Sequence, residues 1–414
     1  MERCDQKGGQ QNPQDAERRP LDEDAHGKSP GPANAGTSCG KGRRSVRPLS
    51  KESRPPAIRN PAAYCRKVPR GPHCPQRPAP KARPASADRS APSNGARRPG
   101  PHLGGATHAH RNHGAGAVGG YFGARLAATH GAEVHFIARG RHLEAIRRDG
   151  LRIESEAAPL HLTDVRATDD PAEVGPVDLV LFAVKLWDTD RAAEACRPLV
   201  KPGTVVVTVQ NGVTGMDTLC QILGREHVAG GVAHIGATIA APGVIRHTGT
   251  LARLTYGELD GRPSPRLTAF HALAEAAGFE AVLSAAILRA QWEKFAFLAP
   301  FSGVTALTRQ PAGVIRRVPE SRALFLDAVA EVARLARARD IDLGTGIVAR
   351  VEALLDGVPP AMTSSMLNDL TRGGRLELPW LSGAVVQLGS ELGVPTPVHR
   401  VVAAALAPYA DGPP

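Results

Sequence analysis

The chain has 414 residues, a formal net charge of +11, six cysteines and 36 prolines, a length that allows two domains with a large core. The cysteines follow no C-x-x-C or other metal-ligand spacing, so the sequence predicts no metal site and no disulfide framework, and favours the reducing cytoplasm. No apolar run is long enough to span a membrane, and the longest, residues 295–307, fits a buried helix.

The positive charge belongs to an N-terminal tail. Residues 1–113 contain 22 Lys/Arg and 9 Asp/Glu, a net charge of +13, whereas the remainder contains 29 and 31, a net charge of −2. The tail also holds 17 of the prolines and almost no large aliphatic residues, so it cannot bury enough surface to offset its ordering entropy. We therefore predict a disordered or spurious tail over residues 1–107. A nucleic-acid-binding or membrane-surface arm is the alternative, but the nearly neutral body predicts neither partner for the folded part.

A glycine-rich motif of the form G-x-G-x-x-G follows the tail and runs into a helical pattern. In a dinucleotide-binding unit, the first glycine allows a tight turn, the second lets the backbone approach a pyrophosphate, and the third lets the helix pack closely on a sheet. The helix N-terminus then offers N–H groups and a positive dipole end to the phosphates. The residues that we predict to bind the cofactor here are Gly114, Ala115, Gly116, Ala117, Val118 and Gly119.

The residue after the next predicted strand indicates which dinucleotide is bound. Residues 133–138 alternate as a strand, and Arg139 follows where an NAD-binding protein usually carries Asp or Glu. Arg141 lies two residues further on. A cation at this place suits a 2′-phosphate, so we predict NADPH rather than NADH. A solvated loop charge is the alternative for Arg139.

The strand that should precede the glycine motif is missing from the sequence pattern. Residues 107–113 read Thr-His-Ala-His-Arg-Asn-His, which has no β-branched apolar run, and a Rossmann unit without its first strand should not fold well. Read one base later, codons for residues 108–113 permit Met-(Arg or Leu)-Ile-(Ala or Val)-Ile, a normal first strand. We therefore hypothesise a one-base frame error immediately before Gly114, with a natural tail as the alternative. Resequencing the gene tests this, and an intact frame would exclude it.

Two continuous apolar runs predict strands that are buried on both faces of a parallel sheet. They cover residues 179–184 and 203–209. Lys185 ends the first run and Asn211 follows the second. Ligands bind at the carboxyl edge of such sheets, so both residues are candidates for a binding site.

The pattern changes from strands to helices near residue 285. Residues 244–247 and 251–256 are the last extended segments of this sheet, and we expect them to form a hairpin. Beyond them, apolar residues recur at helical spacing in segments 286–307, 325–335, 347–355, 362–371 and 381–392. The sequence therefore predicts an α/β fold: a Rossmann-type dinucleotide-binding domain over residues 108–284, followed by an all-helical domain over residues 285–414.

Several short motifs follow one another in an order that is itself informative. They are the glycine motif at Gly114, Val184-Lys-Leu-Trp, Val209-Gln-Asn-Gly-Val, Trp292-Glu-Lys-Phe, Ser364-Ser-Met-Leu-Asn-Asp, Glu377 and Gly393-Val-Pro-Thr-Pro. In this order they resemble the ketopantoate reductase family, from Gly114 to the end of the chain. The resemblance implies an NADPH-binding Rossmann domain, a helical domain and an active-site cleft between them. It also implies reduction of a small 2-keto acid, 2-dehydropantoate (ketopantoate), to pantoate for pantothenate and coenzyme A synthesis, and it leaves a homodimer open.

The resemblance assigns the chemistry to two residues. Lys294 matches the family's proton donor, and burial of a lysine on a largely apolar helix lowers its pKa into a useful range. Glu377 matches the acid that contacts the substrate hydroxyl and the cofactor side. The ordinary alternatives are a helix lysine that reaches solvent and a surface charge at a helix start.

Further positions match residues that bind cofactor or substrate. Lys185, Asn211 and Ala237 match cofactor-contacting positions, and Asn211 also matches one that touches the substrate. Ser365 matches a hydroxyl that binds the substrate carboxylate. A turn residue is the alternative for Asn211, and a helix N-cap is the alternative for Ser365.

The chain departs from the family at several asparagines. Leu298 and Ser302 stand four and eight residues after the lysine, on the same helix face, where the family usually has Asn, and we predict that they line the substrate site. Ala312 and Met362 replace two more. Because a site that hydrogen-bonds a hydroxyl discriminates strongly, these losses favour a more apolar 2-keto acid as an alternative substrate. A non-catalytic dinucleotide-binding protein is the other alternative, and retention of the lysine and the glutamate argues against it.

Overall fold

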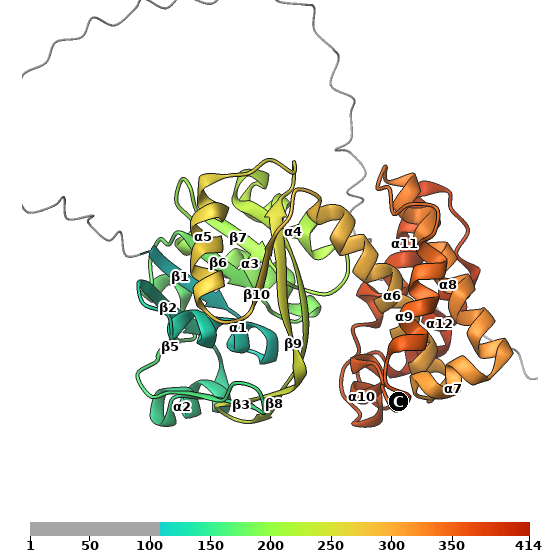
Figure 1. The fold of residues 1–414 in the computed structure, drawn as a ribbon, viewed down its shortest axis with the longest axis horizontal. Helices are drawn as coiled ribbons and strands as arrows, with labels where there is room; N and C mark the ends of the chain where they lie inside the picture. Colours follow the sequence, from blue (N-terminus) through green and yellow to red (C-terminus); the bar gives the residue numbers. More distant parts are fainter. Residues whose placement is uncertain (1–107) are drawn as a thin grey trace, which may run out of the picture. The chain divides into compact units, whose positions relative to one another are not determined.

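The computed structural model describes residues 108–414, so the tail predicted for residues 1–107 lies outside the described residues. Within the described part, ten strands form one sheet in the order β4-β3-β9-β8-β7-β6-β1-β2-β5, with β10 paired to β9 (Figure 1). The strands are β1 (His108–His113), β2 (Ala132–Ile137), β3 (Leu151–Ser155), β4 (Leu160–Leu162), β5 (Arg166–Thr168), β6 (Leu179–Phe182), β7 (Val205–Thr208), β8 (Val228–Ala241), β9 (Val244–Glu258) and β10 (Glu280–Leu283). The α-helices of this region are α1 (Ala117–Ala127), α2 (Gly140–Asp149), α3 (Thr189–Ala195), α4 (Gly215–Leu223) and α5 (Pro265–Ala276).

The prediction of buried parallel strands is confirmed in β6 and β7. Every residue of both strands is buried, and the two strands pair in parallel. Their carboxyl ends lie at one edge of the sheet, which places Lys185 and Asn211 at that edge. The α/β prediction with a Rossmann-type sheet is therefore confirmed.

The expectation that the first strand is missing is wrong. Residues 108–113 form β1, which pairs in parallel with β2 over six positions and with β6 over four. The ladder uses backbone groups, which any residue except proline supplies, and β-propensity yields to the context that the neighbouring strands impose. The frame-error hypothesis concerns the gene and stays open.

The hairpin expected within residues 244–256 is also wrong. These residues belong to one strand, β9, which pairs antiparallel with β8 along most of its length. The register shifts where Gly249 has a φ of 77°, a conformation that glycine adopts without strain. The chain therefore absorbs the apparent turn as an irregularity inside a long strand, and the hairpin turn lies at Gly243.

From residue 287 on, the described chain is helical, and the predicted boundary at 284/285 falls between β10 and the first of these helices. Helix α6 packs against α8, α10 and α12 around a core of apolar side chains. The helix expected from residue 362 begins instead at Ser365, because the Ser364 side chain caps it by accepting the Leu367 N–H at 3.0 Å. The helices are α6 (Ile287–Thr308), α7 (Ala312–Arg317), α8 (Pro319–Ala338), α9 (Ile347–Gly357), α10 (Ser365–Thr371), α11 (Ser382–Leu392) and α12 (Pro397–Leu406).

A buried carboxylate holds the start of α12. Glu331 of α8 is 1 % exposed, and its two oxygens accept the backbone N–H groups of Val398 and His399 at 2.7 and 3.0 Å. The first N–H groups of a helix have no partner within the helix, so this side chain satisfies two of them.

We expect Glu331→Ala to lower the free energy of unfolding by about 2–4 kcal/mol, because one buried and one partly buried N–H group lose a charged acceptor. Asp327→Ala, an exposed position on the same helix, is the control and should change it by less than about 0.5 kcal/mol. Urea denaturation of both variants measures the difference. Equal stability of the two variants would contradict the capping role.

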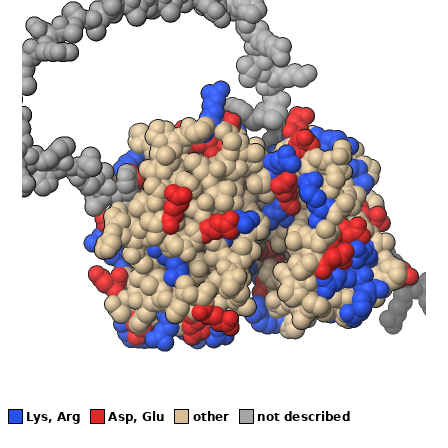
Figure 2. All heavy atoms as spheres, in the orientation of Figure 1, with Lys and Arg blue, Asp and Glu red and all other residues tan. Residues whose placement is uncertain are grey.

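The face of the folded part drawn in Figure 2 carries both signs of charge. Blue Lys/Arg and red Asp/Glu side chains are interspersed on it among uncharged ones. This face therefore shows no single-sign field of the kind that attracts a nucleic-acid backbone.

Candidate active site

The glycine motif forms the turn between β1 and α1. Gly114 has a φ of 104°, and a Cβ there would lie 2.9 Å from backbone atoms of Ala183 and Val184, so only glycine fits. A Cβ on Gly116 would meet nothing within 4 Å. Helix α1 starts with no capping side chain and no acidic residue in its first turn. The turn thus offers a helix N-terminus and open space of the kind a pyrophosphate uses.

Two arginines stand at the end of β2. Arg139 is the N-cap residue of α2 and Arg141 lies in its first turn, and both are exposed. Among residues 108–414, neither pairs with a carboxylate. Two guanidinium groups are therefore available to an anion beside the glycine turn.

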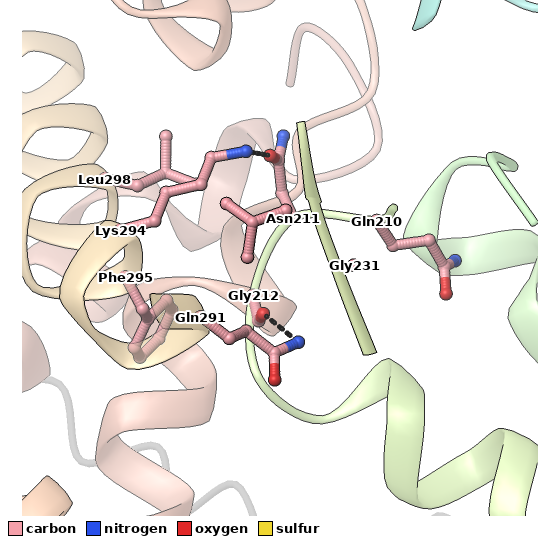
Figure 3. Close-up of a pocket in the computed structure, with 9 residues that line it drawn as sticks. Gln210, Asn211, Gly212, Gly231, Gln291, Lys294, Phe295 and Leu298 are labelled. Carbon is pink, nitrogen blue, oxygen red and sulfur yellow. Dashed lines mark hydrogen bonds between the residues drawn. The ribbon is translucent and has the colours of Figure 1, made fainter. Parts of the chain in front are cut away.

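Lys294 of α6 reaches the edge of the sheet. Its Nζ donates to Asn211 Oδ1 at 3.0 Å (Figure 3). It also donates to the Ala233 carbonyl at 2.8 Å. Although the residue as a whole is half-buried, its ammonium is enclosed, and burial lowers its pKa to about 8, with the Glu377 charge acting in the opposite direction. The ammonium has three donors, so one remains for a ligand.

Glu377 lies close enough to Lys294 for its charge to act on the ammonium. Its side chain is buried, and it accepts the Leu186 N–H at 3.4 Å. Lys185 Nζ lies 3.8 Å from Glu377 Oε2 and 3.7 Å from Asp369 Oδ2, and its side chain is about half exposed. The loop after β6 is thereby tied to the helical region by charge.

A small pocket collects part of the predicted site around Lys294. Its lining comes from the loop after β7, from β8 and from α6: Gln210, Asn211, Gly212, Gly231, Val232, Gln291, Lys294, Phe295 and Leu298 (Figure 3). The predicted residues Lys294, Asn211 and Leu298 are thus together in one cavity.

Three polar residues near this pocket were missed by the sequence analysis. Gln291 donates to the Gly212 carbonyl at 3.2 Å, and Gln210 donates to the Val184 carbonyl at 3.1 Å, so both fix the loops that carry the site. Burial, followed by the Lys294 charge, lowers the pKa of His234 to about 4. Gln210 stands inside the Val209-Gln-Asn-Gly motif and Gln291 one turn before Lys294, which are the only sequence cues to them.

Three other predicted substrate and cofactor residues, Ser302, Ser365 and Ala237, do not line this pocket. Ser302 is fully buried two turns after Lys294, and its hydroxyl has no hydrogen-bond partner among the described residues. Ser365 is exposed in the first turn of α10, outside the pocket lining. Ala237 is half-buried on β8, four residues beyond the carbonyl that Lys294 contacts.

Residues 108–414 contain no cluster of three His, Cys, Asp or Glu side chains arranged to hold a metal ion. No helix in the same range has the length and apolar character needed to cross a bilayer.

Models of one known protein family match most of the described chain. The family model for ketopantoate reductase PanE/ApbA matches residues 113–261, and the model for its C-terminal part matches residues 286–410. A 2-dehydropantoate 2-reductase of Mesorhizobium japonicum is 31 % identical over 311 residues, covering 70 % of this chain and 94 % of that protein.

Solved structures agree with the family models. A PanE/ApbA family ketopantoate reductase from Ralstonia eutropha JMP134 superposes with a TM-score of 0.67 at 33 % identity, covering 73 % of this chain and 98 % of that one. A D-mandelate dehydrogenase solved with NADH and anilino(oxo)acetate shares the fold at 21 % identity, with a TM-score of 0.66, and covers 73 % of this chain and 98 % of its own. From the two family models and these relatives, the chain belongs to the ketopantoate reductase family of oxidoreductases.

Proposed function

We propose that the protein reduces 2-dehydropantoate to pantoate with NADPH, in the cytoplasm and as a step of pantothenate and coenzyme A synthesis, with Lys294 as the proton donor. The observation that carries this proposal is the enclosed ammonium of Lys294. Its lowered pKa and its unused donor suit a general acid near neutral pH. A homodimer stays open as the assembly.

The residues around the glycine turn fit a dinucleotide. The turn leaves open space at Gly116, the α1 N-terminus is uncapped, and Arg139 and Arg141 pair with no described carboxylate. When bound, the nicotinamide supplies a hydride to C2 of the keto acid. Lys185, Asn211 and Ala237 would then contact the cofactor, as the family resemblance implies.

The proton follows a separate route, through the chain's own residues. The Lys294 ammonium gives one proton to the carbonyl oxygen as that oxygen gains charge, which completes the secondary alcohol. Asn211 and the Ala233 carbonyl hold the ammonium in place through its other two donors. The Glu377 carboxylate raises the pKa of the ammonium and so favours its protonated form before reaction.

The reaction is tested by following NADPH consumption with 2-dehydropantoate and by identifying pantoate as the product. Turnover that needs both compounds supports the proposal. Dinucleotide binding without turnover of any 2-keto acid would instead support the non-catalytic alternative. A second candidate substrate, a more apolar 2-keto acid, is favoured by Leu298, which lines the pocket where the family usually has an amide.

The cofactor preference has its own test. Arg139→Ala should weaken NADPH binding by about 1.5–3 kcal/mol, because a charge-assisted bond to the 2′-phosphate is lost, and should leave NADH binding nearly unchanged. Fluorescence titration with both cofactors measures this. Arg166→Ala, an exposed arginine paired with Glu133 on the next strand, is the control. Equal weakening for both cofactors would refute the assignment.

A further inference from the structure

The imidazole of His142 joins two parts of the Rossmann region that are far apart in the sequence. Its Nε2 lies 2.8 Å from the Ala115 carbonyl oxygen in the glycine motif. Its Nδ1 lies 3.0 Å from the backbone nitrogen of Gly243, in the turn between β8 and β9. The side chain is half-buried in the first turn of α2.

The two partners fix the tautomer of the ring. A backbone N–H can only donate, so Nδ1 must accept from Gly243, and a carbonyl oxygen can only accept, so Nε2 must carry the hydrogen. The ring is therefore neutral, and burial lowers its pKa, against the hydrogen bond to Ala115. Both backbone partners would lose their hydrogen bonds if the ring were replaced by an apolar one.

The bond to Ala115 sets the direction of one peptide group. The peptide between Ala115 and Gly116 is planar and trans, so its N–H points away from its carbonyl oxygen. With the carbonyl held by His142, the Gly116 N–H points the opposite way. Gly116 is the N-cap residue of α1, and the space on its Cβ side is open, since a Cβ there would meet nothing within 4 Å. A backbone N–H at an uncapped helix N-terminus is the kind of group that binds a phosphate.

The hydrogen bond from the Gly243 N–H anchors the His142 side chain to the turn between β8 and β9. Gly243 has a φ of 75°, and a Cβ there would lie 3.2 Å from Ala145 Cβ, so the turn sits tightly on α2. Its carbonyl accepts the Arg152 N–H at 2.9 Å, which joins it to β3. His142 thus joins the glycine turn to the turn between β8 and β9.

We propose that His142 is a positioning residue for dinucleotide binding, which orients the Ala115–Gly116 peptide toward the pyrophosphate by bridging the glycine turn to the β8–β9 turn. This inference rests on the proposed function. It assigns His142 to the pyrophosphate, which NADPH and NADH share, whereas Arg139 is assigned to the 2′-phosphate, which only NADPH carries.

The experiment titrates NADPH and NADH into the full-length protein and into His142→Phe, which keeps a ring of similar size without either hydrogen bond. We expect His142→Phe to raise the Kd of both cofactors by a similar factor, roughly tenfold. At saturating NADPH, kcat and the KM for the keto acid should stay within about twofold. His161→Phe is the control, because His161 bonds the Asp149 carbonyl at the other end of α2, at 2.8 Å, and should leave both Kd values unchanged.

His142→Asn separates the two bonds and serves if the phenylalanine variant does not fold. Its Oδ1 can still accept from the Gly243 N–H, but the asparagine side chain is too short for its amide nitrogen to reach the Ala115 carbonyl. The Kd of both cofactors should therefore still rise. Unchanged Kd values in a folded His142 variant would overturn the proposal, and so would a loss confined to NADPH. If the wild-type protein binds neither dinucleotide, the proposed function falls as well, whereas wild-type binding that His142→Phe retains overturns only the inference.

Discussion

Replacing Lys294 with alanine is expected to lower kcat by roughly 10²- to 10⁴-fold, the usual contribution of a general acid, and to leave NADPH binding nearly unchanged. Lys294 lines the pocket with Asn211, and its ammonium donates hydrogen bonds to Asn211 and to the Ala233 carbonyl. Its removal leaves the developing alkoxide without a proton donor. Steady-state kinetics and cofactor titration together separate a loss of chemistry from a loss of binding.

The pH profile tests the same assignment in a different way. A lysine that acts as an acid must be protonated, so with a pKa of about 8 the wild-type kcat/KM should fall as the pH rises through 8. This limb should vanish in Lys294→Ala. Lys294→Arg should also be slow, because a guanidinium keeps the charge but does not release its proton.

A surface lysine provides the control for these variants. Lys201 has an exposed side chain and pairs with Asp178 at 2.8 Å, so Lys201→Ala should keep both the rate and the profile. If Lys294→Ala keeps the wild-type pH profile, Lys294 is not the proton donor.

The local patterns of the sequence were sufficient for much of the fold. A turn that admits only glycine at Gly114, and two strands buried along their whole length, leave direct marks in the order of residues. The first strand leaves no such mark, because residues 108–113 lack a β-branched apolar run, whereas their pairing with β2 and β6 uses backbone groups that almost any residue supplies. The sequence analysis divided the long strand β9 into two segments, because Gly249 is a residue type typical of turns.

In the candidate site, single residues could be predicted from local sequence, whereas the contacts between distant residues could not. Lys294 and Asn211 were found through short motifs, but their contact spans 83 residues and only the fold brings them together. The bridge from His142 to Gly243 spans 101 residues, and no spacing rule reveals it. Ser364 rather than Ser365 caps α10, and adjacent serines give no pattern from which to choose between them.

The family resemblance implies asparagines at four positions where this chain has Leu298, Ser302, Ala312 and Met362. Leu298 lines the pocket beside Lys294 and Phe295. Ala312 and Met362 are neighbours in space, since the Ala312 N–H donates to the Met362 carbonyl at 2.9 Å. Two of the replaced amides thus belong to one corner of the fold, while a third is in the pocket itself. The Ser302 hydroxyl, one turn beyond Leu298, is buried and lacks a described hydrogen-bond partner.

We expect these replacements to change the ranking of substrates. A 2-keto acid with a plain alkyl or aryl side chain should have a higher kcat/KM than 2-dehydropantoate, whose 4-hydroxyl loses its hydrogen-bond partners. Each lost bond to a neutral group contributes about 0.5–1.5 kcal/mol, so the two amides replaced at Leu298 and Met362 amount to roughly 10- to 100-fold. The ratio of kcat/KM values across a panel of 2-keto acids measures this directly.

The reverse change is the decisive test of that argument. Leu298→Asn combined with Met362→Asn should move the preference back toward 2-dehydropantoate, because both amides are restored. Leu354→Asn, at an exposed leucine of α9, is the matched control and should leave the ratio unchanged. Because the argument concerns a ratio between two substrates, a general loss of activity in the double variant cannot imitate the expected shift. If the wild-type protein already turns over 2-dehydropantoate more efficiently than every alkyl or aryl analogue, the apolar wall does not set the specificity, and hydrogen bonds from other groups, with Ser302 the first to examine, must hold the hydroxyl.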